Sequence, residues 1–207
     1  MDRVKAMPER VKFRHAFEMV RLYQKHVLPF VEAQLGYAEM HNLRSVWQAG
    51  IIPIREEGNE IEKYEQAYSN WLWVARCSHD ALADQLSKEE ILEYKRLLLK
   101  LYVQVLDNPD LVMLRLFSAH GKLAKALLYE MQWLTPIEVT SFSNRKVTCV
   151  VHDCKIRQLP QYERVCRVDC MHLGAAYANK VYHLTRITIP SDHGCTFTLT
   201  PWEKQEE

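Results

Sequence analysis

The hydrophobic positions in the first two thirds of the chain recur at intervals of three and four residues, the period of an amphipathic helix. Asn59 with Glu62, and Ser87 with Glu90, have the spacing of capping pairs at helix starts. Pro29 lacks a backbone donor and is expected to kink or end the first helix. We therefore expect helices over Pro8–Ala33, Tyr37–Ala49, Asn59–Leu86, Ile91–Leu106 and about Asn108–Trp133.

The pattern changes after Thr135. Residues 136–151 are rich in β-branched side chains and end in a strand-like segment, and helical spacing returns over Pro160–Tyr182. Leu184–Ile189 and Cys195–Thr200 alternate on either side of a turn and predict a hairpin. The predicted fold is α+β. A helical N-terminal two-thirds (residues 1–135) packs on a small C-terminal β-α-β-β unit (residues 136–207), within one compact domain.

The charge of the chain narrows the classes of partner. Its 207 residues carry 27 Lys plus Arg against 26 Asp plus Glu, which argues against nucleic acid or an anionic membrane as the main partner. Met1–Arg14 has no apolar segment typical of a signal peptide, and four charges interrupt the most apolar run, Leu111–Leu134. We expect a cytoplasmic protein whose partner is a small molecule. A homo-oligomer is compatible with this composition.

Candidate chemistry is concentrated near the C-terminus, where five of the six cysteines lie between Cys149 and Cys195. Their spacings match no zinc-finger or CxxC pattern, so free thiols are expected. Helical spacing places Cys166, Asp169 and Cys170 on one face. A neighbouring carboxylate raises the pKa of a thiol, so a nucleophilic cysteine would need a base or a cation from elsewhere. The nearby candidates are His152, His172, His183 and His193.

The alternative interpretation is that these groups are structural. Free cysteine is among the most buried residue types and commonly packs as a small hydrophobe, as we expect for Cys149 and Cys170. His79 and His120 lie on predicted scaffold helices and are interpreted as satisfied or exposed side chains. Asp169 is harder to explain in this way, because a buried unpaired carboxylate is costly. It should be either at the surface or paired.

Three short motifs in the C-terminal part follow one another in an informative order. A strand is followed by a cysteine (Val147–Cys154), a helix carries Cys-x-x-Asp (Cys166–Asp169), and the last strand begins Gly-Cys-Thr-Phe (Gly194–Phe197). In this order the motifs resemble the L-2-amino-thiazoline-4-carboxylic acid hydrolase family and, more distantly, the vinyl reductase-type small-molecule-binding domains. The resemblance covers about a quarter of the chain. The N-terminal part is similar only in being helical.

The resemblance implies hydrolytic opening of a small cyclic amidine or thiazoline-type C–N bond in an amino acid-like substrate. It places the site on Cys154, Cys166, Asp169 and Cys195. In a thiol mechanism Cys166 is the nucleophile, Asp169 holds a ring nitrogen or an orienting histidine, and His152 moves protons. In a metal mechanism the three thiolates bind a thiophilic ion that activates water. No cofactor is expected, and a divalent metal remains an open alternative.

Two other classes of function compete with a hydrolase. The same pocket could hold a hydrophobic or tetrapyrrole-like molecule without turnover, as in a sensory domain, because five Trp and ten Tyr could line a larger cavity. The thiols could also simply be packed in a structural or interaction protein. The hypotheses differ in one spatial requirement, because only the first needs the four site residues to meet at one cavity.

Overall fold

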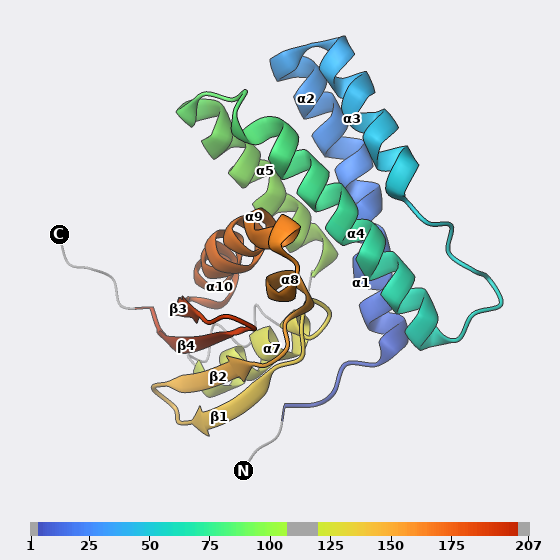
Figure 1. The fold of residues 1–207 in the computed structure, drawn as a ribbon. Helices are drawn as coiled ribbons and strands as arrows, with labels where there is room; N and C mark the ends of the chain where they lie inside the picture. Colours follow the sequence, from blue (N-terminus) through green and yellow to red (C-terminus); the bar gives the residue numbers. More distant parts are fainter. Residues whose placement is uncertain (1–3, 107–119, 203–207) are drawn as a thin grey trace.

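Figure 1 shows the computed structural model, in which long helices stand beside a small sheet built from the C-terminal third of the chain. The structure describes residues 4–106 and 120–202. The helix expected over about Asn108–Trp133 therefore falls within the described residues only from position 120 onward. The N-terminal helices are α1 (Glu9–Leu22), α2 (Leu28–Leu35), α3 (Tyr37–Gly50), α4 (Glu60–Ala83), α5 (Lys88–Val105) and α7 (His120–Met131).

Both predicted capping boxes are confirmed. The Asn59 side chain accepts hydrogen bonds from the backbone N–H groups of Ile61 and Glu62 at 3.0 Å each, and the Glu62 side chain bonds back to the Asn59 N–H. Ser87 and Glu90 make the same exchange at the start of α5. These bonds satisfy donors that have no partner inside the helix, and so they fix where α4 and α5 begin.

The first helix changes type near Pro29 instead of stopping. A π-helical turn, η1 (Tyr23–Val27), joins α1 to α2, and Pro29 occupies the first turn of α2. Because Pro29 cannot donate to the preceding turn, the local widening of the helix accommodates a missing bond without breaking the rod. Tyr23, the first residue of η1, is completely buried.

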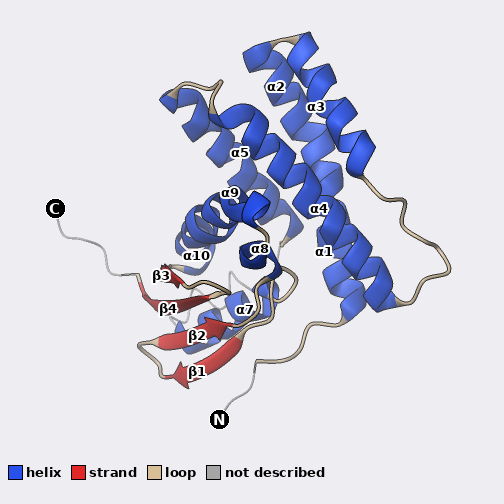
Figure 2. Ribbon diagram, in the orientation of Figure 1, coloured by secondary structure: helices blue, strands red, loops and turns tan. Residues whose placement is uncertain are grey.

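The C-terminal unit is a four-stranded antiparallel sheet with a broken helix between its two hairpins (Figure 2). The strand order is β1-β2-β4-β3. The α+β fold class is confirmed, as is the predicted β3–β4 hairpin, and the sheet has one strand, β1, more than expected. The elements are β1 (Glu138–Phe142), β2 (Val147–Val151), α8 (Lys155–Gln158), a 3-10 turn η2 (Pro160–Tyr162), α9 (Glu163–Val165), the π-helix η3 (Cys166–Leu173), α10 (Gly174–Tyr182), β3 (Leu184–Pro190) and β4 (Cys195–Pro201).

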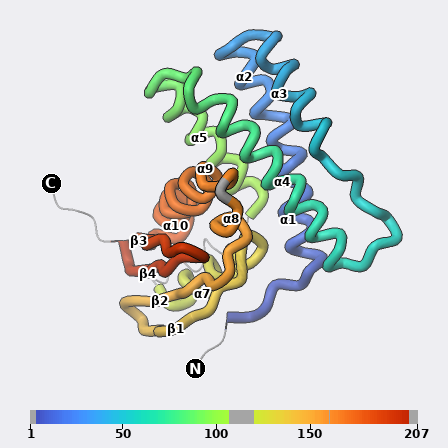
Figure 3. Tube along the Cα trace, viewed as in Figure 1, coloured from blue at the N-terminus to red at the C-terminus, as the bar shows by residue number. Residues whose placement is uncertain are grey.

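The path of the chain brings η3 and α10 between the sheet and α5, while α7 packs directly against β3 and β4 (Figure 3). One face of the sheet is buried against these helices, and strand alternation places Cys149, Arg186 and Phe197 on that face. Arg186 is thus a charged residue in a row of core positions. No helix in the described ranges 4–106 and 120–202 is long and apolar enough to cross a membrane.

Candidate functional site

The carboxylate of Asp169 is the centre of a buried polar network. It is 1% exposed and lies on η3. Its Oδ2 is 2.6 Å from His79 Nε2 of α4, and its Oδ1 accepts hydrogen bonds from Tyr102 of α5 at 3.0 Å and from Tyr23 of η1 at 3.4 Å. Three separate helices therefore hold one carboxylate, and the sequence expectation that Asp169 is paired if buried is fulfilled.

The network continues on the far side of the imidazole. Tyr94 Oη lies 3.1 Å from His79 Nδ1, so both ring nitrogens of His79 have partners. Burial first, and the negative charge of Asp169 second, raise the pKa of Tyr94 and of Tyr102 well above the usual value for tyrosine. These phenols therefore keep their protons. Tyr94 can donate to Nδ1 while His79 Nε2–H donates to Asp169, which matches each donor with an acceptor.

The two π-helical segments of the described chain meet at this carboxylate. Tyr23 comes from η1 and Asp169 from η3, and both side chains are almost fully buried. Single π turns insert one residue into a helix and so rotate a chosen side chain off the regular helical face. They are found often at functional sites. Here the two rotated side chains contact each other.

A buried cation lies beside the network. The Arg186 side chain of β3 is 8% exposed, its guanidinium lies 4.5 Å from the centre of the Phe197 ring, and its Nε has no hydrogen-bond partner. Burial lowers the pKa of Arg186, and nearby thiols including Cys170 and Cys195 counteract that effect. No acidic side chain within the described residues forms an ion pair with this guanidinium. A buried cation without an anionic partner is costly and is a candidate for binding one.

Asp169 and Arg186 line the same small cavity. Its volume of about 20 Å³ suffices for about one water molecule, and the remainder of its wall is mostly apolar. The lining residues are Tyr102, Leu106, Leu127, Met131, Leu134, Asp169, Leu173, Gly174, Tyr177 and Arg186. We call this cavity the chamber. A negative and a positive side chain on its wall, within an apolar surround, give it the character of a binding site for a dipolar molecule.

Gly174 keeps room for the guanidinium. A Cβ added at Gly174 would collide with Arg186 Nη1, whereas one added at Gly121 of α7 would make only ordinary contacts, the nearest at 3.4 Å. We expect Gly174→Ala to lower the free energy of unfolding by about 1–3 kcal/mol through overpacking. Gly121→Ala should leave it unchanged or raise it, because alanine favours helix. Urea denaturation of both variants checks this, and equal behaviour of the two would contradict it.

The predicted cysteines lie near one another, but none of them lines the chamber with Asp169, so the structure does not bring the four predicted site residues together at this cavity. Cys154, Cys166 and Cys195 are close enough to affect one another's charge, and none forms a disulfide. Burial raises the pKa of Cys166, although Arg157 opposes the shift, and it raises the pKa of Cys195 to about 11. Both thiols are therefore protonated at neutral pH and are weak nucleophiles. No group of three His, Cys, Asp or Glu side chains in the described parts of the chain is arranged to hold a metal ion.

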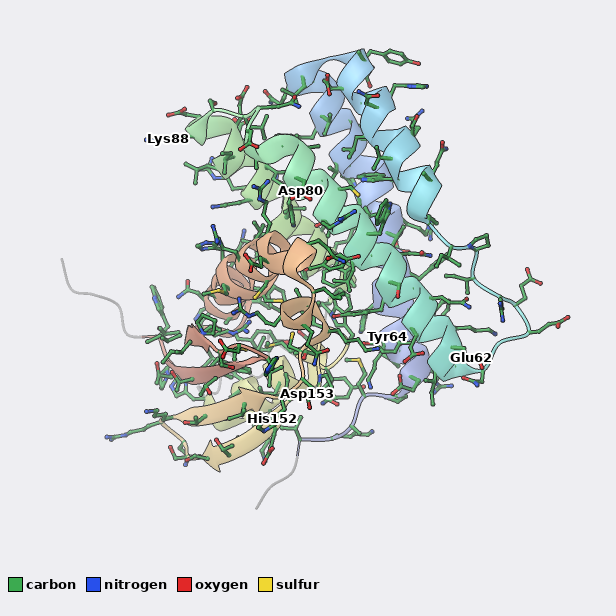
Figure 4. The ribbon with its side chains drawn as sticks, in the orientation of Figure 1. Glu62, Tyr64, Asp80, Lys88, His152 and Asp153 are labelled. Carbon is green, nitrogen blue, oxygen red and sulfur yellow. The ribbon has the colours of Figure 1, made fainter. Side chains whose placement is uncertain are left out.

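The structure does not bring His152 to the other predicted residues. Its side chain is 65% exposed and pairs with Glu138 at 3.1 Å. Val151, at the end of β2, points into the core, so alternation turns the next residue outward. In Figure 4, His152 lies at the end of β2, away from Asp80 of α4, the neighbour of His79. The histidine on Asp169 is His79, from a helix that the sequence suggested was scaffold.

Comparison with known proteins gives no assignment. No family model matches the chain, and neither a curated protein nor a solved structure matches it.

The site must therefore be interpreted from its own geometry. His79, Tyr94, Tyr102 and Arg186 were not predicted as site residues. The aromatic stripe of α4 and α5 is typical of a core, and nothing in its spacing distinguishes a tyrosine that bonds a carboxylate from one that only packs. The available signal was Asp169 itself, because a carboxylate in an apolar helix requires partners from elsewhere in the fold.

Proposed function

We propose that this protein is a hydrolase that opens a cyclic amidine or thiazoline-type C–N bond in a small amino acid-like substrate. One observation carries the proposal, namely that Asp169 and Arg186, which forms no ion pair among the described residues, lie on the wall of one chamber. An amidine is cationic and pairs with a carboxylate, while a substrate carboxylate pairs with a guanidinium. The order of motifs that resembles the L-2-amino-thiazoline-4-carboxylic acid hydrolase family supports the same class of substrate.

In this proposal Asp169 and His79 perform the proton transfers. The chamber has room for about one water, so in this proposal it must widen to admit the amidine beside that water. The water would attack the amidine carbon while one of its protons passes to the carboxylate. The same proton then goes to the departing nitrogen as the C–N bond breaks, and the proton of the added hydroxyl group passes to the released amine as the carbonyl forms, so the net change is the addition of one water. His79, held by Tyr94, orients Asp169 and stabilises its charge.

The protonated state of the thiols favours this acid–base version over attack by Cys166. Burial raises the pKa of Cys166, and the charged group that influences it most is Arg157, which is not a base. Cys154 and Cys195 lie close to Cys166, but none of the three thiols lines the chamber. A thiol nucleophile remains the competing mechanism.

The test is incubation of the purified protein with L-2-amino-thiazoline-4-carboxylic acid and related cyclic amidines, with mass spectrometry for the addition of one water. We expect Asp169→Asn to lower turnover by about 10²-fold or more. Asp80→Asn, at an exposed acid, is the matched control and should have no effect. Turnover that survives in Asp169→Asn but is lost in Cys166→Ser would refute the acid–base version in favour of the thiol mechanism.

Binding without turnover is the second candidate. The observation that favours it is that both ring nitrogens of His79 are already bonded, as in a network built to hold a shape. The same incubation separates the two candidates. Saturable binding of a cyclic amidine without any product would support the binding module and exclude the hydrolase for that compound.

A further inference from the structure

A second and larger cavity opens at the surface beside the chamber. It has a volume of about 320 Å³ and is lined by Lys12, Tyr64, Tyr68, Gln132, Leu134, Thr135, Pro136, Ile137, Asp153 and Lys155. We call it the outer cleft. Figure 4 labels two of its residues, Tyr64 on α4 and Asp153 in the loop after β2. Asp153 has a left-handed backbone with φ of 46°, a conformation that aspartate tolerates better than most residues.

Leu134 is the residue shared by the two cavities. It lines the outer cleft on one side and the chamber on the other, and it is 9% exposed. The chamber alone holds little more than one water, so a ring-containing substrate needs additional space. The outer cleft offers such space and shares Leu134 with the chamber, so we take Leu134 as the partition between them.

Two tyrosine hydroxyls of α4 hold the segment that carries the partition. Tyr64 donates to the Trp133 carbonyl at 2.7 Å, and Tyr68 donates to the Leu134 carbonyl at 2.8 Å. The segment itself is incompletely satisfied, because Thr135 Oγ1 and Trp133 Nε1 are buried without a hydrogen-bond partner. The partition thus depends on contacts that lie in the wall of the outer cleft.

The charges around the outer cleft indicate the chemistry of its occupant. Lys12 pairs with Glu9 at 2.7 Å, and Lys155 pairs with Glu65 at 3.5 Å. Asp153 adds a negative charge to the rim. The cations are therefore already neutralised, which disfavours a phosphate or a second carboxylate. The remaining wall contains the polar residues Gln132 and Thr135, and otherwise consists of aromatic and apolar side chains, including the Tyr64 and Tyr68 rings with centres 5.7 Å apart.

We propose that the chamber and the outer cleft form one binding site for a two-part ligand. The polar head lies between Asp169 and Arg186, and an uncharged aromatic or branched aliphatic tail passes Leu134 into the outer cleft. This inference rests on the proposed function, because the proposed function is what places the polar head between Asp169 and Arg186. It adds that the substrate is larger than a single amino acid-like ring and that Leu134 and Ile137 determine which tails are accepted.

The test compares two probes, acetamidine as a head alone and 4-phenylbutanamidine as a head with an aromatic tail, by calorimetric or saturation-transfer titration. We expect the longer probe to bind about tenfold or more tightly, because it buries a phenyl ring. Ile137→Ser should remove most of that advantage without affecting acetamidine. Leu134→Ala should tighten binding of the longer probe several-fold. The matched control is Ile187→Ser, at an isoleucine of β3 that is 58% exposed and outside both cavities.

The outcomes separate this inference from the proposed function. If Asp169→Asn weakens binding of both probes but Ile137→Ser weakens neither, the position of the head in the chamber is supported and the two-part ligand is overturned. If Asp169→Asn leaves both probes unaffected, the proposed position of the head fails and the two-part ligand fails with it. Equal affinity of the two probes for the unmodified protein would also overturn the inference.

Discussion

Replacing Asp169 by alanine should lower the free energy of unfolding by about 3–5 kcal/mol, because each buried donor left without its acceptor costs about 1–3 kcal/mol. The carboxylate bonds His79, Tyr102 and Tyr23, and all three would lose their acceptor in the interior. Urea denaturation followed by circular dichroism measures the change. We also expect an unchanged m-value, because unfolding should expose a similar surface area in the variant and in the unmodified protein.

Asp80→Ala is the matched control for this variant. Asp80 follows His79 directly on α4, and its ion pair with Arg164 at 3.4 Å joins side chains that are 50% and 41% exposed. Exposed pairs of this kind contribute about 0–1 kcal/mol. A loss of less than about 1 kcal/mol in Asp169→Ala would show that the network does not hold the C-terminal unit to the helices.

Acidification from pH 6.5 to pH 4 should destabilise the protein through His15. Burial, with a smaller contribution from Arg14, lowers the pKa of His15 from 6.5 to about 4. The folded state therefore keeps His15 neutral in this window, while the unfolded state binds a proton. The contribution of neutral His15 to the free energy of unfolding is fully present above pH 6.5. Below that pH it falls by up to about 1.4 kcal/mol per pH unit, or about 3 kcal/mol over the whole window.

The variant His15→Gln isolates this effect, because its amide has no charge at any pH. The difference in unfolding free energy between the unmodified protein and the variant, measured in urea at half-unit steps of pH, should shift by about 3 kcal/mol between pH 6.5 and pH 4. His41 of α3 is exposed, so His41→Gln serves as the control. A constant difference across this range would contradict the assignment to His15.

The network at Asp169 also links stability to the proposed chemistry. Asp169 is where the C-terminal unit contacts helices η1, α4 and α5, and it is also the base of the proposed hydrolysis. Pre-organised groups of this kind act without rearranging during the reaction. Substitutions at His79 or Tyr102 should therefore alter both stability and turnover, whereas Ile137→Ser in the outer cleft should alter ligand affinity alone.

Patterns of short range decided the features that the sequence predicted correctly. Asn59 with Glu62, and Ser87 with Glu90, marked helix starts because a capping pair involves only residues three apart. The alternation over Leu184–Ile189 and Cys195–Thr200 predicted the final hairpin for the same reason, since a strand repeats every two residues. The strand β1 carries a bulge between Val139 and Ser141, which interrupts its alternation and made it harder to recognise.

The composition of the site was decided by contacts between residues distant in sequence. His79 is 90 positions from Asp169, and Tyr23 is 146 positions away, so no local pattern links them. The sequence by itself determined the α+β class, the helix starts and the need of Asp169 for partners. Only the tertiary structure decided that the partners are His79 and two tyrosines, that Arg186 faces the same chamber, and that His152 faces outward. The reason is physical. Helix and strand periods follow from neighbouring backbone geometry, whereas which buried charges meet depends on how the helices and the sheet pack.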